Sequence, residues 1–537
     1  MQPSPRTFLP PAEARLLPTE GPVRRRAVLG ASLALPGWLA GCATPGGPSG
    51  SSAAPGTDSG AAYRLANRIS WGATDAEVER VQRLGAERYI AEQLQPGDAA
   101  LPPQAQSQID ALRLRQTSPL ALWTEIEAAR KAGEALPDEA SRKAAQDAFQ
   151  QALNKLAREV ATRDLLRALY SPRQLQEQLQ WFWFNHFNVH QYKSNIRVLL
   201  ADYEERAIRP HVLGRFRDLL GAVTRHPAML RYLDNEQNAA GRINENHARE
   251  LLELHTLGVD GGYTQRDVQE LARVLTGHGV NFSDKAPNVR RELAGQYERQ
   301  GIYEFNPARH DYGDKTLLGQ TVRGRGAAEL DEVLDRLASH PATARFVCRK
   351  LARQLLADEP PPAVVGAMTA AWARSGGRIA DVLAPLLHAP EFTAPAPAKF
   401  KDPVHYVVSA VRACYGERVV LNTGPMQGWL NRMGQGLFNR QTPDGYPSNA
   451  SAWTGSGQMA VRLEIARTLA SGSAGLFKTD DPTAPREQPA FPQLMRPLYW
   501  QAVRPRLAAA TRDALDAAAT PQDWNTLYLA SPEFMYC

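Results

Sequence analysis

Apolar side chains recur every three or four residues through most of this chain, and this period is the feature that most limits its fold. The long run Glu139–Tyr170 alternates Ala, Leu and charged residues with the 3.6-residue period of a helix. Similar patterns begin at Tyr63 and continue to the last residues. We therefore predict a mainly α fold. The 537 residues exceed what one small core needs, which predicts one large multi-helical domain or two packed lobes, 63–280 and 327–537.

Two stretches lack helical spacing. Residues 281–326 hold Tyr303 and Phe305 around the polar turn His310–Gly313, which predicts a short β-hairpin or a long ordered loop near residues 295–325. The stretch Gly434–Ser456 is rich in Gly, Asn and Pro and too polar for a helix. A loop of this length inside a compact domain usually has a function or wraps the fold.

The N-terminal residues have the pattern of an export signal. Three arginines, Arg24–Arg26, precede the apolar run Ala27–Ala40, which is too short to span a bilayer. The arginines resemble a twin-arginine signal, although Val28 replaces the usual Phe. The segment Leu39–Cys42 resembles a bacterial lipobox, which implies cleavage before Cys42 and attachment of a lipid to it. The alternative is an ordinary signal peptide with a chance cysteine.

These patterns predict a signal peptide over residues 1–41, a flexible tether over 42–62, and a folded domain over 63–535. We expect export by the twin-arginine route and a lipid anchor on Cys42, with the protein facing the periplasm. The membrane is thus the predicted partner, and any protein or polymer partner is undefined. Without residues 1–41 the net charge falls from +6 to +3, and no Lys/Arg-rich run remains, so nucleic-acid binding is not predicted.

Side chains able to bind metal or move protons gather in Asn244–Asp267, NENHARELLELHTLGVDGGYTQRD. Asn244 fits a helix N-cap and Gly258 a helix end. At 100° per residue, His247, Glu250 and His255 can converge on a partner helix. Glu253 faces away from His255, and we expect it to meet Arg249 or another cation.

A second such stretch is Trp181–His190, WFWFNHFNVH. His186 and His190 are four residues apart, as in zinc-binding helices, but no Glu follows His186 as in HExxH. His310 and Asp311, with Lys315, form a third candidate suited to a metal or a proton relay. Each group has a structural alternative: a hydrogen-bonded core histidine, an ion pair with a nearby arginine, or a turn capped by Asp311.

Several common motifs are absent from the sequence. It contains no GxSxG elbow, no GxGxxG after a strand, no GxxxxGK phosphate loop and no paired-cysteine metal signature. Cys348 and Cys414 lie in apolar helical runs and are expected to be buried thiols. These absences argue against Rossmann oxidoreductases, α/β-hydrolases and P-loop enzymes.

Several segments resemble a bacterial family known as domain of unknown function 1800, over nearly the whole chain after Tyr63. They include LLRALYSPRQLQEQLQWFWFNHFNVH, NENHARELLELHTLGVDGGYTQRD and HPATARFVCRKLARQL. The resemblance implies an exported α-helical protein and favours His186, Glu250, His255 and His310 as functional residues. Members usually have an aromatic residue at His247 and Trp at His278, so we rank these two histidines lower.

Two hypotheses follow. The first is an exported lipoprotein enzyme, hydrolase-like, in which His186, Glu250, His255 and His310 bind a divalent metal. Glu250, His255 and His186 would also act as acid/base groups, and Asn244, Glu253 and Asp311 would orient them. The second is a non-enzymatic envelope scaffold or assembly factor with a structural His/Glu network. An enzyme predicts that these residues converge beside a solvent-reachable cleft, whereas a scaffold predicts that they are paired in a dry core.

Overall fold

The computed structural model describes residues 58–283, 285–395, 398–479 and 491–537. The predicted signal peptide, the lipidation site Cys42 and most of the predicted tether lie outside these residues. The last residues of that tether are helical, because α1 (Ser59–Ile69) begins there. Asp58 caps this helix by accepting a hydrogen bond from the amide of Ala61 at 3.2 Å.

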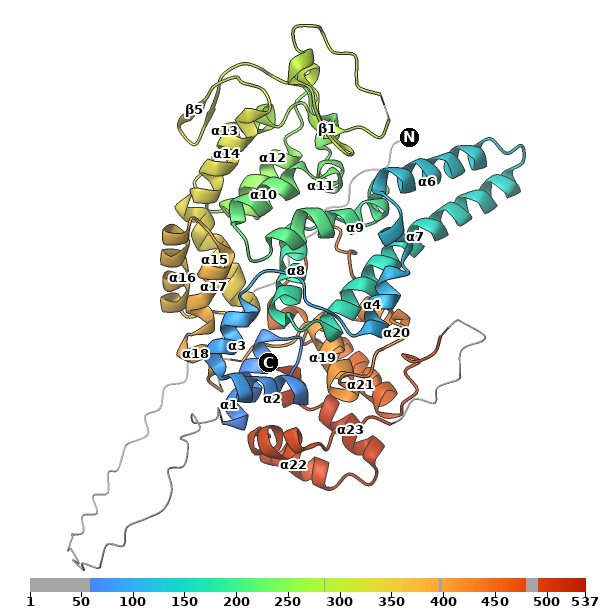
Figure 1. Ribbon diagram of the computed structural model, residues 1–537, viewed down its shortest axis with the longest axis vertical. Helices are drawn as coiled ribbons and strands as arrows, with labels where there is room; N and C mark the ends of the chain where they lie inside the picture. Colours follow the sequence, from blue (N-terminus) through green and yellow to red (C-terminus); the bar gives the residue numbers. More distant parts are fainter. Residues whose placement is uncertain (1–57, 284, 396–397, 480–490) are drawn as a thin grey trace, which may run out of the picture. The chain divides into compact units, whose positions relative to one another are not determined.

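The described residues confirm the mainly α fold (Figure 1). Before the strands come α2 (Asp75–Leu84), α3 (Ala86–Gln93), α4 (Pro103–Asp110), α5 (Arg113–Gln116), α6 (Pro119–Glu134), α7 (Glu139–Tyr170), α8 (Gln174–His186), α9 (Leu200–Asp202), α10 (Phe216–Arg225), α11 (Pro227–Tyr232), α12 (Asn246–Glu250) and α13 (Gln265–Val274). After them come α14 (Ala328–Ser339), α15 (Pro341–Leu355), α16 (Pro362–Ser375), α17 (Ile379–Leu387), α18 (Pro390–Thr393), α19 (Pro403–Tyr415), α20 (Gly424–Arg432), α21 (Ser456–Ala470), α22 (Ala509–Asp516) and α23 (Pro521–Leu529).

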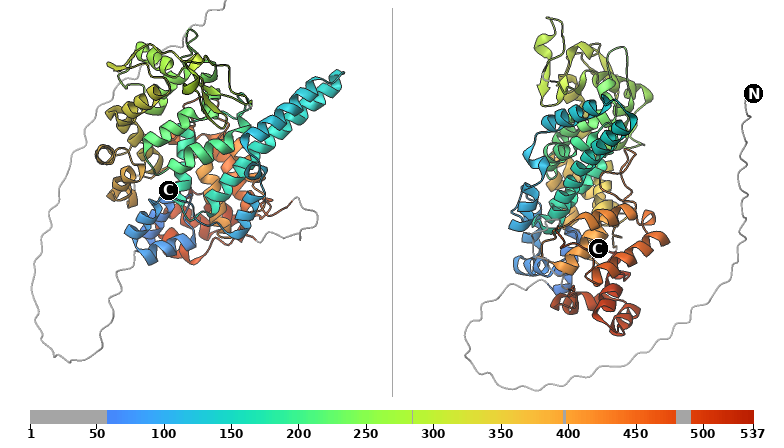
Figure 2. Two further views of the ribbon diagram at one scale, coloured as in Figure 1. Left: turned by 45° about the horizontal axis from the view of Figure 1, so that its top comes forward. Right: turned by 90° about the vertical axis from the view of Figure 1, so that its right-hand side faces the viewer.

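Helices α6 and α7 pack side by side as an antiparallel pair, seen in blue and cyan in Figure 2. Asp138 caps α7, and its side chain accepts the amide of Ser141 at 2.8 Å. Gly133 of α6 allows the close approach, since a Cβ there would lie 2.7 Å from the Cβ of Ala145. Helix α7 has the bounds that its apolar period predicted.

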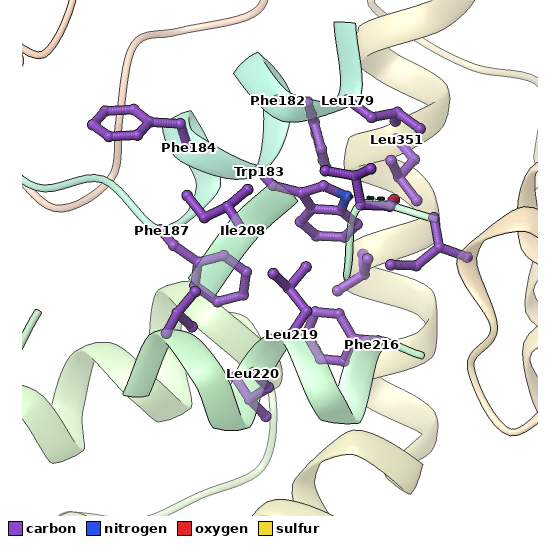
Figure 3. Close-up of a cluster of buried hydrophobic side chains, with 14 of the residues drawn as sticks. Leu179, Phe182, Trp183, Phe184, Phe187, Ile208, Phe216, Leu219, Leu220 and Leu351 are labelled. Atoms are coloured by element: carbon purple, nitrogen blue, oxygen red, sulfur yellow. Dashed lines mark hydrogen bonds between the residues drawn. The ribbon is translucent and has the colours of Figure 1, made fainter. Parts of the chain in front are cut away.

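The largest apolar cluster surrounds α8 (Figure 3). Trp183 is fully buried at its centre, between Phe187 of the same segment and Phe216 of α10. Its indole N–H donates to the carbonyl oxygen of Val212 at 3.1 Å, which satisfies the ring's polar atom inside the core. Leu351 of α15 closes the cluster from the second half of the sequence. The core therefore joins residues from both predicted lobes.

The predicted non-helical region contains two small antiparallel sheets. β3 (Tyr303–Phe305) lies between β1 (His278–Val280) and β2 (Glu298–Gln300), with His278 opposite Phe305. The hairpin of β4 (Lys315–Leu317) and β5 (Gln320–Val322) follows, and it packs against α13 and α14. This confirms the expected β element near residues 295–325.

A second apolar cluster lies among α19, α20, α21 and α23. Arg462 of α21 is completely buried in it, and its guanidinium donates to the carbonyl oxygen of Lys401 at 2.7 Å. The guanidinium also lies 4.8 Å and 4.7 Å from the ring centroids of Phe400 and Tyr406. The segments 399–401 and 535–537 run beside it and exchange backbone hydrogen bonds.

Some elements differ from the predicted ones. Helix α8 begins at Gln174, not at Pro172, and it ends at His186, so His190 does not share its face. It ends there because the next backbone groups bind other segments: Phe187 O accepts from the Tyr203 hydroxyl at 2.7 Å, and Gln191 N donates to Phe438 O at 3.0 Å. Helix α20 was not predicted. None of the described helices is long and apolar enough to cross a membrane.

Three helical segments wind more widely than an α-helix. They are the π-helices η2 (Tyr203–Ile208), η5 (Leu251–Thr256) and η9 (Tyr499–Val503). The first and third lie in runs of apolar spacing, Tyr203–Ile208 and Tyr499–Val503. The second lies in the stretch that carries Glu253 and His255. π-helical turns are rare and often occur at functional sites.

Candidate active site

His186, the last residue of α8, lies between two other segments. Its Nδ1 is 2.9 Å from the ammonium of Lys350 in α15, and its Nε2 is 3.2 Å from the carbonyl oxygen of His255 in η5. An ammonium can only donate, so Nδ1 accepts, and Nε2 carries the proton that His255 O accepts. Burial and the nearby Lys350 charge lower the pKa of His186 well below its ordinary value. His186 is therefore a neutral link between Lys350 and η5.

The π-helix η5 positions His255. Leu257 N donates to Leu252 O at 2.8 Å, one residue further than in an α-helix, and Thr256 Oγ1 donates to Leu251 O at 2.6 Å. His255 is buried with its ring centroid 6.2 Å from that of His186 and 5.0 Å from that of Phe187. Its Nε2 has no hydrogen-bond partner among the described residues. The hydrogen bond to His186 is formed by the backbone carbonyl of His255, not by its imidazole.

Glu250, at the end of α12, is the half-buried acid of the site. Within the described part of the chain its carboxylate forms no hydrogen bond or salt bridge. Burial and repulsion from Glu253 and Asp444 raise the pKa of Glu250 to about 7, against the attraction of Arg249. A carboxyl with this pKa exchanges a proton near neutral pH, as a general acid or base must.

Lys350 was missed by the sequence analysis. It is partly buried, and burial together with the charge of Arg353 lowers the pKa of Lys350 to about 8, although Asp444 opposes the shift. The signal available was a lysine within the apolar run HPATARFVCRKLARQL, one of the segments that carry the family resemblance. A lysine in such a run also fits a solvent-exposed helix face, so spacing alone does not single it out.

The loop Gly434–Ser456 covers the end of α8 and brings Asp444 to the site. Asn185 holds it with two hydrogen bonds: Nδ2 donates to Tyr446 O at 2.9 Å, and Oδ1 accepts from Tyr446 N at 2.6 Å. Asn188 Nδ2 donates to Arg440 O and Thr442 O at 3.0 and 2.9 Å. Asp444 is exposed and lies near both Glu250 and Lys350, since its charge shifts the pKa of each. The loop is thus an ordered wrapper that contributes a carboxylate.

His310 belongs to a separate network. Its Nε2 is 2.9 Å from Glu329 Oε1, and its Nδ1 is 2.8 Å from Thr276 O. Lys315 Nζ donates to Glu329 Oε2 at 2.5 Å, and the side chains of His310, Lys315 and Glu329 are completely buried. Burial alone would raise the pKa of Glu329, but the hydrogen bonds from His310 and Lys315 lower it. Every member of this network has a charged partner, which is typical of a structural ion cluster.

The predicted orienting residues have local partners. Asp311 binds Arg273 at 2.8 and 3.1 Å and accepts from Gly313 N at 2.9 Å, and these bonds lower the pKa of Asp311 to about 2. Asn244 Oδ1 accepts from Asn246 N at 3.0 Å at the start of α12. Glu253 accepts from the Tyr263 hydroxyl at 3.3 Å. The expected Glu253–Arg249 pair is absent, because Arg249 binds Glu245 at 3.0 Å instead.

The four predicted metal ligands do not come together. His186 and His255 are neighbours, Glu250 lies five residues before His255 in the chain, and His310 lies in the Glu329 cluster. Across the described ranges, no three His, Cys, Asp or Glu side chains gather in a way that could hold a metal ion. His247 and His278, ranked lower from the sequence, are buried, and burial lowers the pKa of His247 to about 3. The thiols of Cys348 and Cys414 are free and buried, as expected.

Fold and site together define a mainly helical protein with a polar site between α8, α12, η5 and α15. Comparison with protein families gives the same answer as the motifs: residues 64–536 match DUF1800, described as a protein of unknown function. The chain belongs to this family. No curated protein and no solved structure matches it.

Proposed function

We propose that this protein is an exported, lipid-anchored enzyme that carries out hydrolase-like acid–base chemistry at Glu250 and Lys350. The observation that carries the proposal is Glu250: a half-buried carboxyl, with no hydrogen bond or salt bridge among the described residues, whose pKa is raised to about 7. Two other carboxylates illustrate the contrast: Glu329 and Asp311 are both paired and have lowered pKa values. Glu250 departs from that pattern in both respects.

In the proposed reaction, Glu250 removes a proton from a water molecule whose oxygen attacks the carbonyl carbon of an ester in an envelope polymer. The bond from that carbon to the alcohol oxygen then breaks, and Glu250 returns the proton to the leaving oxygen. Lys350 stabilises the negative charge that develops on the attacked group. His186 holds the Lys350 ammonium through Nδ1, and its other nitrogen is fixed by the His255 carbonyl, so Lys350 has a defined position. Asn185 and the loop Gly434–Ser456 hold Asp444 near both groups.

The test compares Glu250→Gln with Glu245→Gln, a matched control on the neighbouring residue that pairs with Arg249 at the surface. The purified protein is assayed against a panel of p-nitrophenyl esters and purified envelope polymers, with products read by mass spectrometry. We expect Glu250→Gln to lower turnover at least a hundredfold, with Glu245→Gln close to wild type, and EDTA to leave activity unchanged. Activity that survives in Glu250→Gln would exclude the proposed role.

The same proposal includes export and anchoring, which rest on Arg24–Arg26 and on the lipobox-like Leu39–Cys42. Replacing Arg25 and Arg26 by lysine should hold the protein in the cytoplasm. Cys42→Ala should release it from membrane fractions, and metabolic labelling with a fatty acid should no longer mark it. Membrane association that persists in unlabelled Cys42→Ala would contradict a lipid anchor.

A non-enzymatic envelope scaffold is the second candidate, and one observation favours it. Four histidines of the candidate stretches are buried: His186, His247, His255 and His278. None of them lines the cavity of about 650 Å3 that lies beside α10 and η2. A scaffold predicts that the site matters for stability alone. Because Glu250→Gln is expected to be more stable in either case, the deciding result is function: Glu250→Gln that supports envelope integrity in cells as well as wild type does would support the scaffold over the enzyme.

A further inference from the structure

A cavity of about 380 Å3 lies away from the Glu250 site, where α1, α18 and the C-terminal segment meet. Aromatic rings of Tyr63, Tyr528 and Phe534 line it, and so do the guanidinium groups of Arg64 and Arg506. A smaller adjoining hollow shares the three aromatic residues and adds Lys401. The volume is within the range of sites for small organic ligands.

Two of the cations that line this cavity, Arg64 and Arg506, lack negative partners among the described residues. Arg64 Nε donates to the backbone carbonyl of Thr393 at 2.6 Å, and Arg506 lies 4.9 Å from the ring centroid of Tyr63. Neither forms a salt bridge with a described residue. A backbone carbonyl or a ring face leaves the full charge of a guanidinium in place.

Lys401 is the strongest indication of a ligand. Its side chain is 2% exposed, and its Nζ lies 4.1 Å from the ring centroid of Phe534. Within the described ranges the ammonium forms no hydrogen bond or salt bridge. Burying an unpaired ammonium is costly, so such a group normally has an anion or a hydrogen-bond acceptor beside it. Here the space beside it is the smaller hollow, of about 40 Å3, that adjoins the cavity.

The acids nearby do not neutralise these charges. Glu533 also lines the cavity, but its carboxylate accepts from Ala508 N at 2.8 Å and from Thr511 Oγ1 at 3.0 and 3.2 Å. Cys537 lines it too, and burial raises the pKa of its thiol, which keeps the sulfur protonated. The described walls of the cavity and the hollow therefore carry six cations, Arg64, Arg68, Arg506, Lys401, Arg412 and Arg496. Their two side-chain carboxylates, Glu533 and Asp75, are already bound.

We infer that this cavity binds a small organic anion, a phosphate monoester or diester on an apolar body. Lys401, Arg506 and Arg64 would contact the phosphate oxygens, and the rings of Tyr63, Tyr528 and Phe534 would pack against the apolar part. The same chemistry is offered by a soluble phosphate ester and by an anionic phospholipid headgroup. This site is independent of the proposed hydrolysis.

The test is isothermal titration calorimetry on the purified full chain with two soluble probes, phenyl phosphate and dihexanoyl phosphatidylglycerol below its micellar concentration. Binding of phenyl phosphate alone assigns a soluble ester, and binding of the lipid alone assigns a headgroup. Binding of both probes supports the anion site and shows that it accepts either source of the phosphate group. No heat from either probe at millimolar concentration would overturn the proposal.

Variants separate the cavity from general positive charge. Arg506→Gln and Lys401→Met should each weaken binding at least tenfold. Arg467→Gln, an exposed arginine of α21 outside the cavity, should bind like wild type, and so should Glu250→Gln. Lys401→Met should also melt no lower than wild type without ligand, because it removes a buried unpaired charge. Wild-type binding by Lys401→Met and Arg506→Gln, or equal weakening by Arg467→Gln, would rule out the site.

Discussion

Glu250 and Glu329 show how environment gives two glutamates opposite properties. Glu329 is completely buried but accepts hydrogen bonds from His310, Lys315 and the amides of Arg325 and Gly326, which hold it ionised. Glu250 is only half-buried, yet burial and then repulsion from two nearby carboxylates raise its pKa, because no hydrogen bond from a described residue offsets them. Partners, not burial alone, decide which carboxyl can exchange a proton near neutral pH.

The raised pKa of Glu250 makes stability depend on pH. Because the folded protein binds this proton more tightly than the unfolded chain, the free energy of unfolding falls as pH rises from about 4.5 to about 7. Glu250→Gln removes this penalty, so it should be more stable than wild type by about 1 kcal/mol at pH 8, allowing for partial solvent screening, and equal to it at pH 4. Urea denaturation at both pH values measures the difference.

Glu245→Gln serves as the control for this experiment, since Glu245 is paired with Arg249 and Gln265 at the surface. Its stability relative to wild type should change little between pH 4 and pH 8. If the stability difference between Glu250→Gln and wild type is also the same at pH 4 and pH 8, the pKa of Glu250 is not raised in the folded protein.

At the scale of single elements, the loop Gly434–Ser456 depends on one close approach. Gly445 has φ +75°, and a Cβ on it would lie 2.1 Å from Asn185 O. Gly445→Ala should therefore push the loop off α8 and destabilise the protein by about 2 kcal/mol or more. Limited proteolysis should then cut within the loop, while thermal unfolding reports the loss of stability.

Gly434→Ala is the matched control in the same loop. Gly434 also has positive φ, +74°, but its nearest neighbour would be Gln458 Nε2 at 3.9 Å. Gly434→Ala therefore measures the cost of backbone strain alone, about 1 kcal/mol, without the clash that a Cβ at Gly445 makes with Asn185. Equal effects of the two substitutions would mean that contact with Asn185 does not hold the loop.

Sequence reasoning reached most elements and only part of the site. Apolar spacing predicted the bounds of α7. The π-helices were not foreseen, because a turn with one extra residue keeps the same composition and depends on tertiary contacts. The sequence suggested that the imidazoles of His186 and His255 bind one metal ion. In the structure His186 is instead hydrogen-bonded to the backbone carbonyl of His255, which depends on the turn that η5 forms. Lys350 lies 164 residues from His186, so no spacing in the sequence connects the two.

For the whole molecule, contacts between distant segments close the fold. Lys399 N donates to Cys537 O at 3.1 Å, Cys537 N donates to Lys399 O at 2.9 Å, and Lys401 N donates to Met535 O at 2.8 Å. Deleting Met535–Cys537 leaves these groups unpaired beside the second apolar cluster. We expect a loss of about 3 kcal/mol or more in the free energy of unfolding, measured by thermal or urea denaturation.

Cys537→Ser keeps these backbone pairs and should stay within about 1 kcal/mol of wild type. A deletion no more harmful than Cys537→Ser would show that the pairing of residues 399–401 with 535–537 contributes little to stability.

The pairing of residues 399–401 with 535–537 also sets an order of events during synthesis. The two strands are 138 residues apart, and a ribosome adds about 5–20 residues per second, so the first waits on the order of 10 s for the second. During that interval Phe400 and the apolar face of α19 have no complete core to join. In a newly made chain that face therefore stays without its last backbone partners until residues 535–537 have been added, and it offers an apolar surface to other molecules during that interval.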